Sequence, residues 1–343
     1  MRRCGELKHF DMQKNHPLVT FCVVSFNQEA YIEATVRAVF AQTYDALEIL
    51  FSDDASTDRT YAIIQEMVAD YRGPHRIRLN RNPQNMGLAA HITKIFTLFS
   101  GELVFLGAGD DISTPDRVAV TVDAWLNTNQ HAVAIYASSM EIDAEGRLIG
   151  PSTQLPETVL DTRPPLLKMR DPLLNGSTDA YAASFVRNVV IPQGSAEDEY
   201  LYMRAALVGD CLLIQNGLNH YRFHPQSMSS NAGRTFIERQ VRRYTWKKQC
   251  MLDLHQKLDA LLDQRHFPHE KRSAIRRFIQ GQIVKSEVVL KLAQSRRGRI
   301  LSWLEHHPIW KGVFFRPMRA CFRLCVHSER ALCMLGIKRI GAM

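Results

Sequence analysis

The stretch LVFLGAGDDISTPDR, residues 103–117, joins an apolar segment to two adjacent carboxylates, Asp110 and Asp111. Its first four residues are apolar, as expected for a buried β-strand that ends at the glycines. Two neighbouring acids repel each other and lose hydration when buried, so they need a cation or exposure to water. The stretch therefore predicts a core strand whose carboxyl end leads into a polar site.

Strand-like and helix-like segments alternate before this stretch. An apolar, β-rich run occupies residues 18–24, two further strands are expected over residues 46–54 and 76–82, and helix-like patterns fall within residues 32–41, 56–70 and 85–101. The alternation predicts a Rossmann-like α/β domain, with a mostly parallel central sheet and helices on both faces. In such sheets ligands bind beyond the carboxyl ends of the strands, where Asp53, Asp54, Asp110 and Asp111 are expected.

The pattern changes after residue 132. Residues 133–150 are expected to form a strand and a short hairpin that turns at Glu145 and Gly146, so the sheet stops being purely parallel. Five prolines at positions 151, 156, 164, 165 and 172 predict a long surface connection over residues 151–175. Beyond residue 234 the pattern is mainly helical.

Charge is unevenly distributed along the chain. Residues 235–343 contain 23 Lys and Arg against 8 Asp and Glu, whereas the whole chain contains 43 and 35. The net charge is therefore +15 in the last third and −7 before it, which predicts two parts with different partners. We divide the chain into a polar N-terminal tail (1–16), an α/β domain (17–233) and a basic, mainly helical C-terminal region (234–343).

The cysteines and the hydropathy pattern favour a cytoplasmic protein. The seven cysteines form no CxxC pair and no metal-binding spacing, and their odd number argues against a disulfide framework. The first 17 residues are polar, without the apolar core of a signal peptide. No window of about 18 uninterrupted apolar residues exists, so we expect no membrane-spanning helix.

Four polar clusters are expected to share one edge of the sheet: SFN at 25–27, SDDASTD at 52–58, GDD at 109–111 and AEDEYLYMRAALVG at 196–209. A hard divalent cation prefers oxygen ligands and would relieve the repulsion between Asp110 and Asp111. A metal ion bound to a diphosphate is a common use of such an arrangement. The clusters therefore predict a site for a metal ion and a diphosphate.

With these clusters in order, the chain resembles the family 2 glycosyltransferases of the GT-A fold, inverting enzymes that use nucleotide diphosphate sugars. The resemblance covers roughly residues 17–230. It is carried by six motifs in the family's order: VVSFNQEAYIEATVRAVFAQTY, EILFSDDASTDRT, NPQNMGLAAH, GDDISTPDR, AEDEYLYMRAALVGD and YRFHPQSMS. Six motifs in the right order are more specific than any one of them alone.

The resemblance implies a set of nucleotide-binding residues and a metal. The nucleotide site would comprise Val24, Ser25, Phe26, Asn27, Asp54, Asn85 and Asp110, with Asp54 accepting a hydrogen bond from a uracil-type base. Asp111 and His224 would hold Mn²⁺ or Mg²⁺ on the donor diphosphate. Many members carry a further Asp just before the pair, where this chain has Ala108 and Gly109. This departure leaves open which of Asp110 and Asp111 is the direct ligand, and we favour Asp111.

Asp198 is the candidate catalytic base implied by the resemblance. Inversion needs one carboxylate behind the anomeric carbon to take the proton from the attacking acceptor hydroxyl. Glu197 and Glu199 compete for this role. A simpler alternative for all three is an acidic first turn that stabilises a helix over residues 200–208. Likewise, Asp53, Asp54 and Asp58 could act as helix caps, which is the interpretation we favour for Asp58.

Other classes of protein fit the sequence less well. A dehydrogenase would have GxGxxG after the first strand, and a P-loop protein would have GxxxxGK[ST]; the sequence contains neither. A non-catalytic protein of the same fold, binding a nucleotide sugar or a glycan, is the main alternative to an enzyme. The missing upstream Asp keeps this alternative open.

The expected partners follow from the resemblance and from charge. The donor is expected to be a nucleotide diphosphate sugar, with UDP favoured, and the acceptor a glycan or a lipid-linked glycan in polysaccharide synthesis. The basic region could pack on protein or lie on the anionic inner face of the cytoplasmic membrane, for which Trp303, Trp310 and an amphipathic pattern from Met318 are the signals. No recognition motif indicates nucleic acid.

Overall fold

The computed structural model describes residues 2–3, 16–153, 157–170, 178–227, 230, 234–265 and 267–295. The chain divides into two compact units. The first comprises residues 1–193, 197–228 and 261–266, and the second comprises residues 194–196, 229–260 and 267–343. The amphipathic pattern from Met318 and the tryptophans at 303 and 310 lie outside the described residues.

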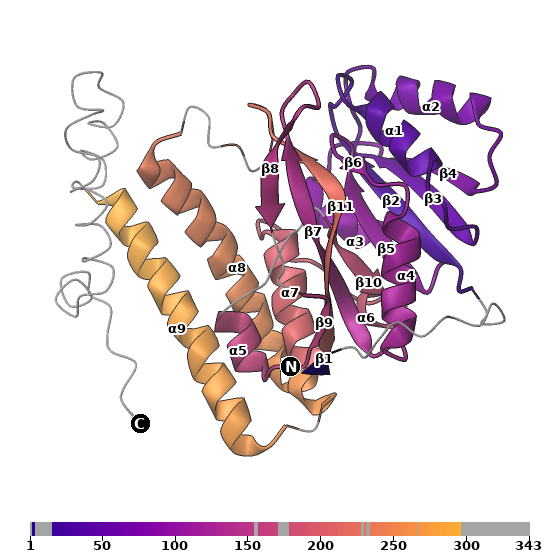
Figure 1. The fold of residues 1–343 in the computed structure, drawn as a ribbon. Helices are drawn as coiled ribbons and strands as arrows, with labels where there is room; N and C mark the ends of the chain where they lie inside the picture. The colour runs from indigo at the N-terminus through magenta and orange to yellow at the C-terminus, as the bar shows by residue number, and fades with distance from the viewer. Residues whose placement is uncertain are drawn as a thin grey trace. The chain divides into compact units, whose positions relative to one another are not determined.

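The first unit is built on one mixed sheet (Figure 1). Its strands are β1 (Arg2–Arg3), β2 (Val19–Ser25), β3 (Leu47–Asp53), β4 (Arg76–Arg81), β5 (Leu103–Ala108), β6 (Ile112–Ser113), β7 (Ala132–Ile142), β8 (Leu148–Thr153), β9 (Val159–Asp161), β10 (Ala180–Ala182) and β11 (Asp210–Arg222). They lie in the order β1-β9-β11-β7-β10-β5-β2-β3-β4, with β6 beside β11 and β8 beside β7.

The parallel part of the sheet follows the alternation in the sequence. β2 pairs in parallel with both β3 and β5, and β3 pairs in parallel with β4. Every residue of β3 is buried, and in β2 only Val24 is partly exposed, as expected for strands covered on both faces. The fold class that the sequence predicts is therefore confirmed.

The other half of the sheet is more mixed than the alternation alone predicts. The short strand β10 lies between β5 and β7 and is antiparallel to both, while β7 and β11 are parallel to each other. The expected hairpin is present, because β8 pairs antiparallel with β7 across a turn in which Gly146 has φ +85°. The proline-rich segment expected as a surface connection contains β9 and the helix α5 (Pro165–Arg170).

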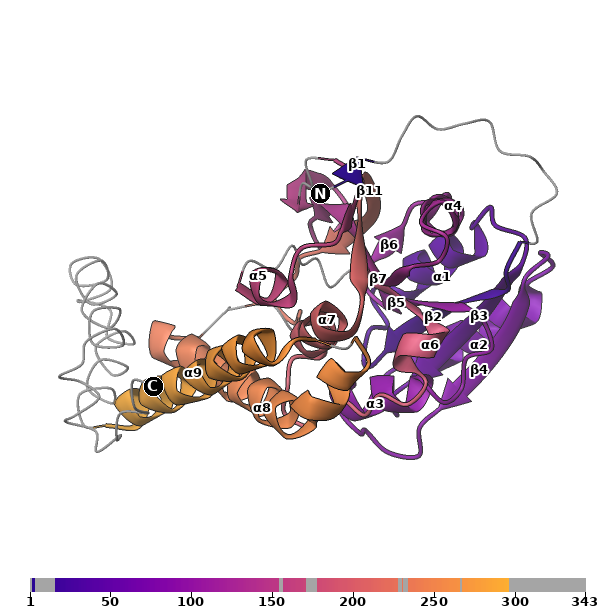
Figure 2. The same cartoon turned by 90° about the horizontal axis from the view of Figure 1, so that it is seen from below.

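Helices cover both faces of this sheet (Figure 2). They are α1 (Ile32–Phe40), α2 (Thr60–Asp70), α3 (Leu88–Ile95), α4 (Arg117–Asn127), α6 (Ala183–Val186) and α7 (Glu197–Val208). α1 and α4 lie on one face, and α3, α6 and α7 lie on the other. Helix α7 begins three residues before the expected position, so that Asp198 falls in its first turn. At its other end, Lys168 Nζ and Arg265 Nη1 both donate to Gly209 O, where cations stabilise the helix terminus.

The second unit contains the two long helices expected beyond residue 234, α8 (Phe236–Asp263) and α9 (His269–Gln294). They share a small buried apolar cluster formed by Phe236, Ile237, Val289 and Ala293. Two ion pairs also join them, Lys248 Nζ to Glu287 Oε1 at 2.9 Å and Arg276 Nη2 to Asp259 Oδ1 at 2.6 Å. Within the described residues, no helix is long and apolar enough to cross a membrane.

Candidate functional site

The polar loops of the first unit meet at the carboxyl ends of β2, β3 and β5. Register places Ser25 beside Asp53 and Val24 beside Ala108. Backbone hydrogen bonds continue past the strand ends, from Asp54 N to Ser25 O and from Gly109 N to Val24 O, both at 2.9 Å. The loops that follow these three strands therefore lie side by side, as the sequence predicts for a ligand site.

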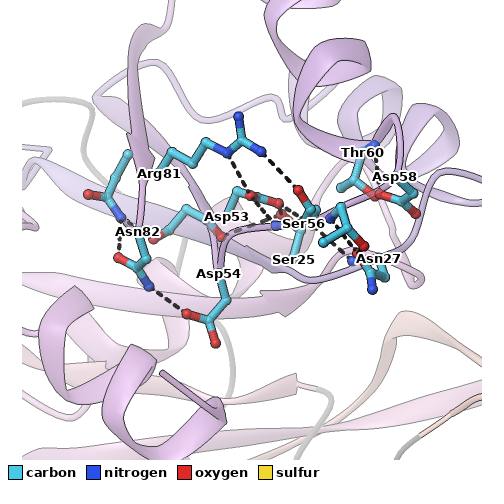
Figure 3. A network of polar contacts seen from close by, with 12 residues as sticks. Ser25, Asn27, Asp53, Asp54, Ser56, Asp58, Thr60, Arg81 and Asn82 are labelled. Atoms are coloured by element: carbon cyan, nitrogen blue, oxygen red, sulfur yellow. Dashed lines mark hydrogen bonds and ion pairs between the residues drawn. The ribbon is translucent and has the colours of Figure 1, made fainter. Parts of the chain in front are cut away.

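Asn27 joins the loop after β2 to the loop after β3 (Figure 3). Its backbone N–H donates to Ser56 Oγ at 2.9 Å, and its side-chain Oδ1 accepts from Thr57 N at 2.8 Å. Asn27 has φ +51°, in the left-handed region that asparagine tolerates better than most residues. This conformation lets the two loops bond to each other directly.

Asp53 is a buried carboxylate whose hydrogen bonds stay within these loops. It accepts from Ser25 Oγ at 3.3 Å and from Ser56 N at 2.8 Å, and Arg81 Nε lies 3.6 Å from it. Asp58, one turn later, accepts from Thr60 N and from Glu29 N. Partial burial acts to raise the pKa of Asp58, but the hydrogen bonds from Thr60 and Glu29 outweigh it and lower the pKa below its usual value. Asp58, just before the N-cap residue Arg59, thus accepts a hydrogen bond from the first residue of α2.

Asp54 is also buried, but its carboxylate holds a different segment, residues 82–87. Oδ1 accepts from Asn82 Nδ2 at 2.8 Å and from Met86 N at 3.0 Å, and Oδ2 accepts from Gly87 N at 3.0 Å. Asn85 Oδ1 also accepts from Gly87 N, at 2.8 Å, and Gly87 has φ +76°. Because a carboxylate offers about four acceptor positions, Asp54 has room for one further donor, on Oδ2.

Asn82 is a residue that the sequence analysis did not single out. Its backbone N–H donates to Asp53 O at 2.8 Å and its Nδ2 donates to Asp54 (Figure 3), so it contacts both acids. Its Oδ1 accepts from Lys94 Nζ at 2.8 Å and from Asn80 Nδ2 at 3.2 Å. The available signals were its place just after a strand and at the start of the motif NPQNMGLAAH. Three of its four partners, Asp53, Asp54 and Lys94, lie 12 or more positions away in the sequence.

Asp110 and Asp111 have different surroundings although they are adjacent. Asp110 Oδ2 lies 2.9 Å from His224 Nε2, and its side chain is 14% exposed. Asp111 is only 3% exposed; its Oδ1 accepts from Arg222 N at 2.9 Å and its Oδ2 from Asn219 Nδ2 at 3.0 Å. Burial and the neighbouring charge of Asp110 raise the pKa of Asp111 to about 7. The two acids thus differ in access to a ligand.

Arg222 and Tyr31 surround this pair. Arg222 Nε donates to Asp110 O at 2.8 Å, and its Nη1 donates to Asp143 O and Ala144 O in the β7–β8 turn. The guanidinium lies over the Tyr31 ring at 5.1 Å, and the same ring lies 4.6 Å from the His224 ring. The ring of Tyr31 and the side chain of Arg222 therefore limit where His224 and Asp110 can move.

The described residues contain no cluster of three or more His, Cys, Asp or Glu side chains that could hold a metal ion. Asp110 and His224 supply one carboxylate and one imidazole, which is a partial ligand set that a diphosphate and water would complete. Imidazole is a less usual ligand for Mg²⁺ than for transition metals, whereas carboxylate suits both Mg²⁺ and Mn²⁺. This pair fits a divalent ion, and it fits Mn²⁺ better than Mg²⁺.

The acidic first turn of α7 forms a second group of carboxylates. Asp198 Oδ1 accepts from Glu199 N at 2.6 Å, and burial raises the pKa of Asp198. Burial and the charge of Asp198 raise the pKa of Glu197 to about 8. A carboxylate with a raised pKa can act as a general base near neutral pH. Among the described residues, no hydrogen bond or ion pair links Asp198 to Asp54, Asp110 or His224.

Asp179 belongs to the same acidic environment and was also missed from the sequence. It is fully buried, Tyr181 Oη donates to its Oδ2, and its Oδ1 has no hydrogen-bond partner in the described part of the chain. Burial raises the pKa of Asp179 well above its usual value, and the charges of Asp198 and Glu197 add to this effect. We find no local sequence pattern that would have indicated it.

The comparisons with known proteins find a family model that matches just under half of the chain. The model described as "Glycosyl transferase family 2" matches residues 20–185. An uncharacterized glycosyltransferase of Haemophilus influenzae is 32% identical over 132 residues, 38% of this chain and 39% of that protein. The chondroitin synthase of Escherichia coli is 30% identical over 136 residues, 40% of this chain and 19% of that protein. The matched segments thus span less than half the length of either relative.

Solved structures with the same fold cover more of the chain. The structure of S. aureus TarS 1–349 in complex with UDP-GlcNAc superposes with a TM-score of 0.55 at 16% sequence identity, over 92% of this chain and 91% of that one. The mannosyltransferase PcManGT from Pyrobaculum calidifontis, in complex with GDP-Man and Mn²⁺, gives a TM-score of 0.50 at 15% identity, over 93% and 88%. At these identities the likeness establishes the fold, and it supports the GT-A prediction.

Proposed function

We propose that this chain transfers a sugar from a nucleotide diphosphate sugar to a hydroxyl group, with inversion, in polysaccharide synthesis; the match of residues 20–185 to the family 2 glycosyltransferase model supports this proposal. One observation carries the proposal. The segment that Asp54 holds follows β4 and Asp110 follows β5, both strands of the parallel part of the sheet, and His224 contacts Asp110 from the segment after β11. A nucleotide can bind at the first and its diphosphate at the second.

The nucleotide would lie on the loop from Val24 to Asn27, whose position is fixed by the bonds of Asn27 to Ser56 and Thr57. The remaining acceptor position of Asp54 suits an N–H group such as that of uracil, which favours a UDP-sugar. Asn85 and Asp110 complete the proposed nucleotide-binding set. The side chain of Asn85 bonds to Gly87 N, so its role would be to shape the segment beside the base.

For the metal ion we propose a different direct carboxylate ligand from the one that the sequence analysis favours. Asp110 and His224 are the better pair for direct contact with Mn²⁺ or Mg²⁺, because both oxygens of Asp111 already accept hydrogen bonds from β11. Asp111 would then support the site by holding Arg222 and Asn219 in place. When bound, the divalent ion would neutralise charge on the departing diphosphate.

Asp198 is proposed as the catalytic base. The acceptor hydroxyl oxygen forms a bond to the anomeric carbon as the bond from that carbon to the diphosphate oxygen breaks. Asp198 takes the hydroxyl proton and the nucleoside diphosphate leaves on the opposite face. One displacement inverts the anomeric centre. The raised pKa of Asp198 favours proton uptake, which supports its choice over the exposed acids of the chain.

The test is a panel of nucleotide sugars, each assayed with Mn²⁺ for thermal stabilisation of the protein and for release of nucleoside diphosphate. We expect one donor to give both signals, and a UDP-sugar is the first candidate. A donor that stabilises the protein, but releases no nucleoside diphosphate with any glycan acceptor tested, would instead favour the alternative of a non-catalytic nucleotide-sugar or glycan-binding protein. Absence of stabilisation by every donor would contradict the proposal.

The acceptor and the location belong to the proposal as well. We propose a glycan or lipid-linked glycan acceptor, met by a cytoplasmic protein at the inner face of the cytoplasmic membrane. The support is the +15 net charge of residues 235–343, since anionic lipids attract basic segments. Comparing the donor-dependent labelling of membrane lipids with that of soluble glycans would test the acceptor class.

A further inference from the structure

Helix α3 carries a buried histidine that the proposed reaction does not use. His91 is 1% exposed, and its Nε2 lies 2.7 Å from Ser52 Oγ, which is also buried. Burial lowers the pKa of His91, so the ring is neutral near pH 7. A polar ring in this place loses hydration that an apolar side chain would not have to lose. The bond to Ser52 offsets this loss, and its effect depends on what the two residues connect.

Ser52 lies at the end of the strand that leads to Asp54. It belongs to β3 and precedes Asp54 by two positions. Asn80 Nδ2 donates to Ser52 Oγ at 2.8 Å, so the hydroxyl hydrogen of Ser52 is available to the neutral ring of His91. Ser52 is therefore satisfied both as an acceptor and as a donor, and it attaches α3 to the end of β3.

The same helix also holds the segment on the other side of Asp54. His91 N donates to Gly87 O at 2.9 Å in the first turn of α3, and Gly87 N donates to Asp54 Oδ2 at 3.0 Å. Gly87 is the N-cap residue of α3 and has no side chain that could cap the helix. A closed ring of hydrogen bonds and short lengths of chain thus runs from Asp54 through α3 and back to β3.

Hydrogen bonds and apolar contacts hold α3 in different ways. Its buried apolar side chains are Ile92 and Ile95, whose packing favours burial without fixing a direction. The bond between His91 and Ser52 has a preferred length and angle. It therefore sets the position of the first turn of this eight-residue helix more narrowly than packing does. Asp54, whose Oδ2 bonds to the start of that turn, is set with it.

We propose that His91 is a positioning residue for the nucleotide: through Ser52 it holds the start of α3 against β3, and so keeps the remaining acceptor position of Asp54 directed at the base. The inference rests on the proposed nucleotide site. It adds to that site a residue that does not touch the ligand. Disturbing the bond should therefore weaken nucleotide binding without removing any group that contacts the nucleotide.

His75 provides a matched control within the same unit. It is 7% exposed, burial lowers its pKa, and its Nε2 lies 3.0 Å from Gln42 O. Gln42 follows α1, and in the described part of the chain no hydrogen bond joins His75 or Gln42 to Asp54 or to residues 82–87. The two histidines thus share burial and a hydrogen bond at Nε2, but of the two it is His91 that is connected to the proposed nucleotide site.

The experiment measures UDP affinity by calorimetry, in the presence of Mn²⁺, with the full chain. His91→Leu removes the bond but keeps an apolar side chain of similar size, and His75→Leu does the same at the control position. We expect the affinity to fall about tenfold in His91→Leu, as when one hydrogen bond is lost, and to stay within about twofold of the parent in His75→Leu. His91→Gln should recover most of the affinity, because its amide can bond to Ser52.

Two further measurements cover a variant that folds poorly and a protein without ligand. Ser52→Ala removes the same bond from the other side, and the double variant with His91→Leu should bind UDP no more weakly than His91→Leu alone. Without ligand, the backbone amides that donate to Asp54 should exchange hydrogen faster in His91→Leu and not in His75→Leu.

Unchanged UDP affinity in His91→Leu overturns the proposal. So does an equal fall in His75→Leu or in His91→Gln, since either would point to general packing rather than to the bond with Ser52. A parent that binds neither UDP nor any other nucleoside diphosphate contradicts the proposed function instead. In that case the exchange of the amides bonded to Asp54 decides alone whether His91 holds this segment, and equal exchange in the parent and in His91→Leu refutes it.

Discussion

His224 and Asp110 form a direct contact, with 2.9 Å between Nε2 of the imidazole and Oδ2 of the carboxylate, although 114 positions separate them in the sequence. The contact connects the loop after β5 with the segment after β11. Asp111, the next residue along the chain, instead accepts hydrogen bonds from Asn219 and from the backbone of Arg222. The two adjacent acids therefore have different partners, His224 for Asp110 and groups of β11 for Asp111.

The first prediction concerns the metal. Thermal stabilisation by UDP should require Mn²⁺ or Mg²⁺ in the parent and should be lost in Asp110→Asn and in His224→Ala, because each removes one of the two side chains facing the ion. Mn²⁺ should be effective at a lower concentration than Mg²⁺. Equal stabilisation by UDP in the presence of a chelator would show that no metal takes part.

Asp111→Ala is the informative comparison for this prediction. It should also abolish the metal-dependent stabilisation, but it should in addition change the stability of the protein without ligand, because it leaves two buried donors without an acceptor at a cost of about 1–3 kcal/mol each. The substitution also removes a carboxylate that is itself unfavourable to bury, and this offsets part of that free-energy cost. Unchanged stability in Asp110→Asn beside altered stability in Asp111→Ala would separate the two roles.

The second prediction tests the base. Asp198→Asn should keep donor affinity and lower the transfer rate by about 100 to 10,000-fold, since general base catalysis typically contributes that much. The measurements are donor binding by thermal shift and transfer by product release. Glu199→Gln serves as the control and should have a much smaller effect. Near-normal transfer by Asp198→Asn would refute the assignment.

The third prediction concerns Asn82. Asn82→Ala removes one hydrogen bond to Asp54 and the acceptor of Lys94, so UDP affinity should fall about tenfold, equivalent to 1.4 kcal/mol. The control is Asn80→Ala, which loses bonds to Ser52 and Asn82 but none to Asp54. It should lower stability by about 1 kcal/mol and leave UDP affinity nearly unchanged. Equal affinities in the two variants would contradict a role for Asn82 in positioning Asp54.

The fourth prediction is a pH dependence of stability. The pKa of Glu197 rises from 4.5 to about 8 on folding, chiefly through burial, so the folded state binds a proton that the unfolded state releases between these values. The stability that this proton provides is complete below about pH 4.5 and is lost as the pH rises towards 8.

Glu197→Gln should therefore flatten the fall in unfolding free energy between pH 4.5 and 8. At pH 8 the variant should exceed the parent by on the order of 1–3 kcal/mol. Chemical denaturation at several pH values, without ligand, gives the comparison. A variant that loses stability with pH as steeply as the parent would show that Glu197 is not the titrating group.

Local pattern was enough to predict the parallel half of the fold and the loops that carry the chemistry. The largely apolar runs before Asp53 and Asp110 indicated buried strands, because apolar side chains lose free energy when exposed to water. Helical periodicity between them fixed the alternation, and right-handed crossover connections then brought the carboxyl ends of the strands to one edge. The loops at Asn27, Asp54 and Asp110 had to meet there.

The partners of these side chains were decided only by tertiary structure. Sequence spacing reports local geometry, whereas the choice between Asp110 and Asp111 depends on Asn219, Arg222 and His224, more than 100 residues away on or beside β11. The position of β10 between β5 and β7 likewise buries Asp179, which no local periodicity indicates. A buried polar atom takes the partner that packing places beside it. That partner is set by the order of strands in the sheet.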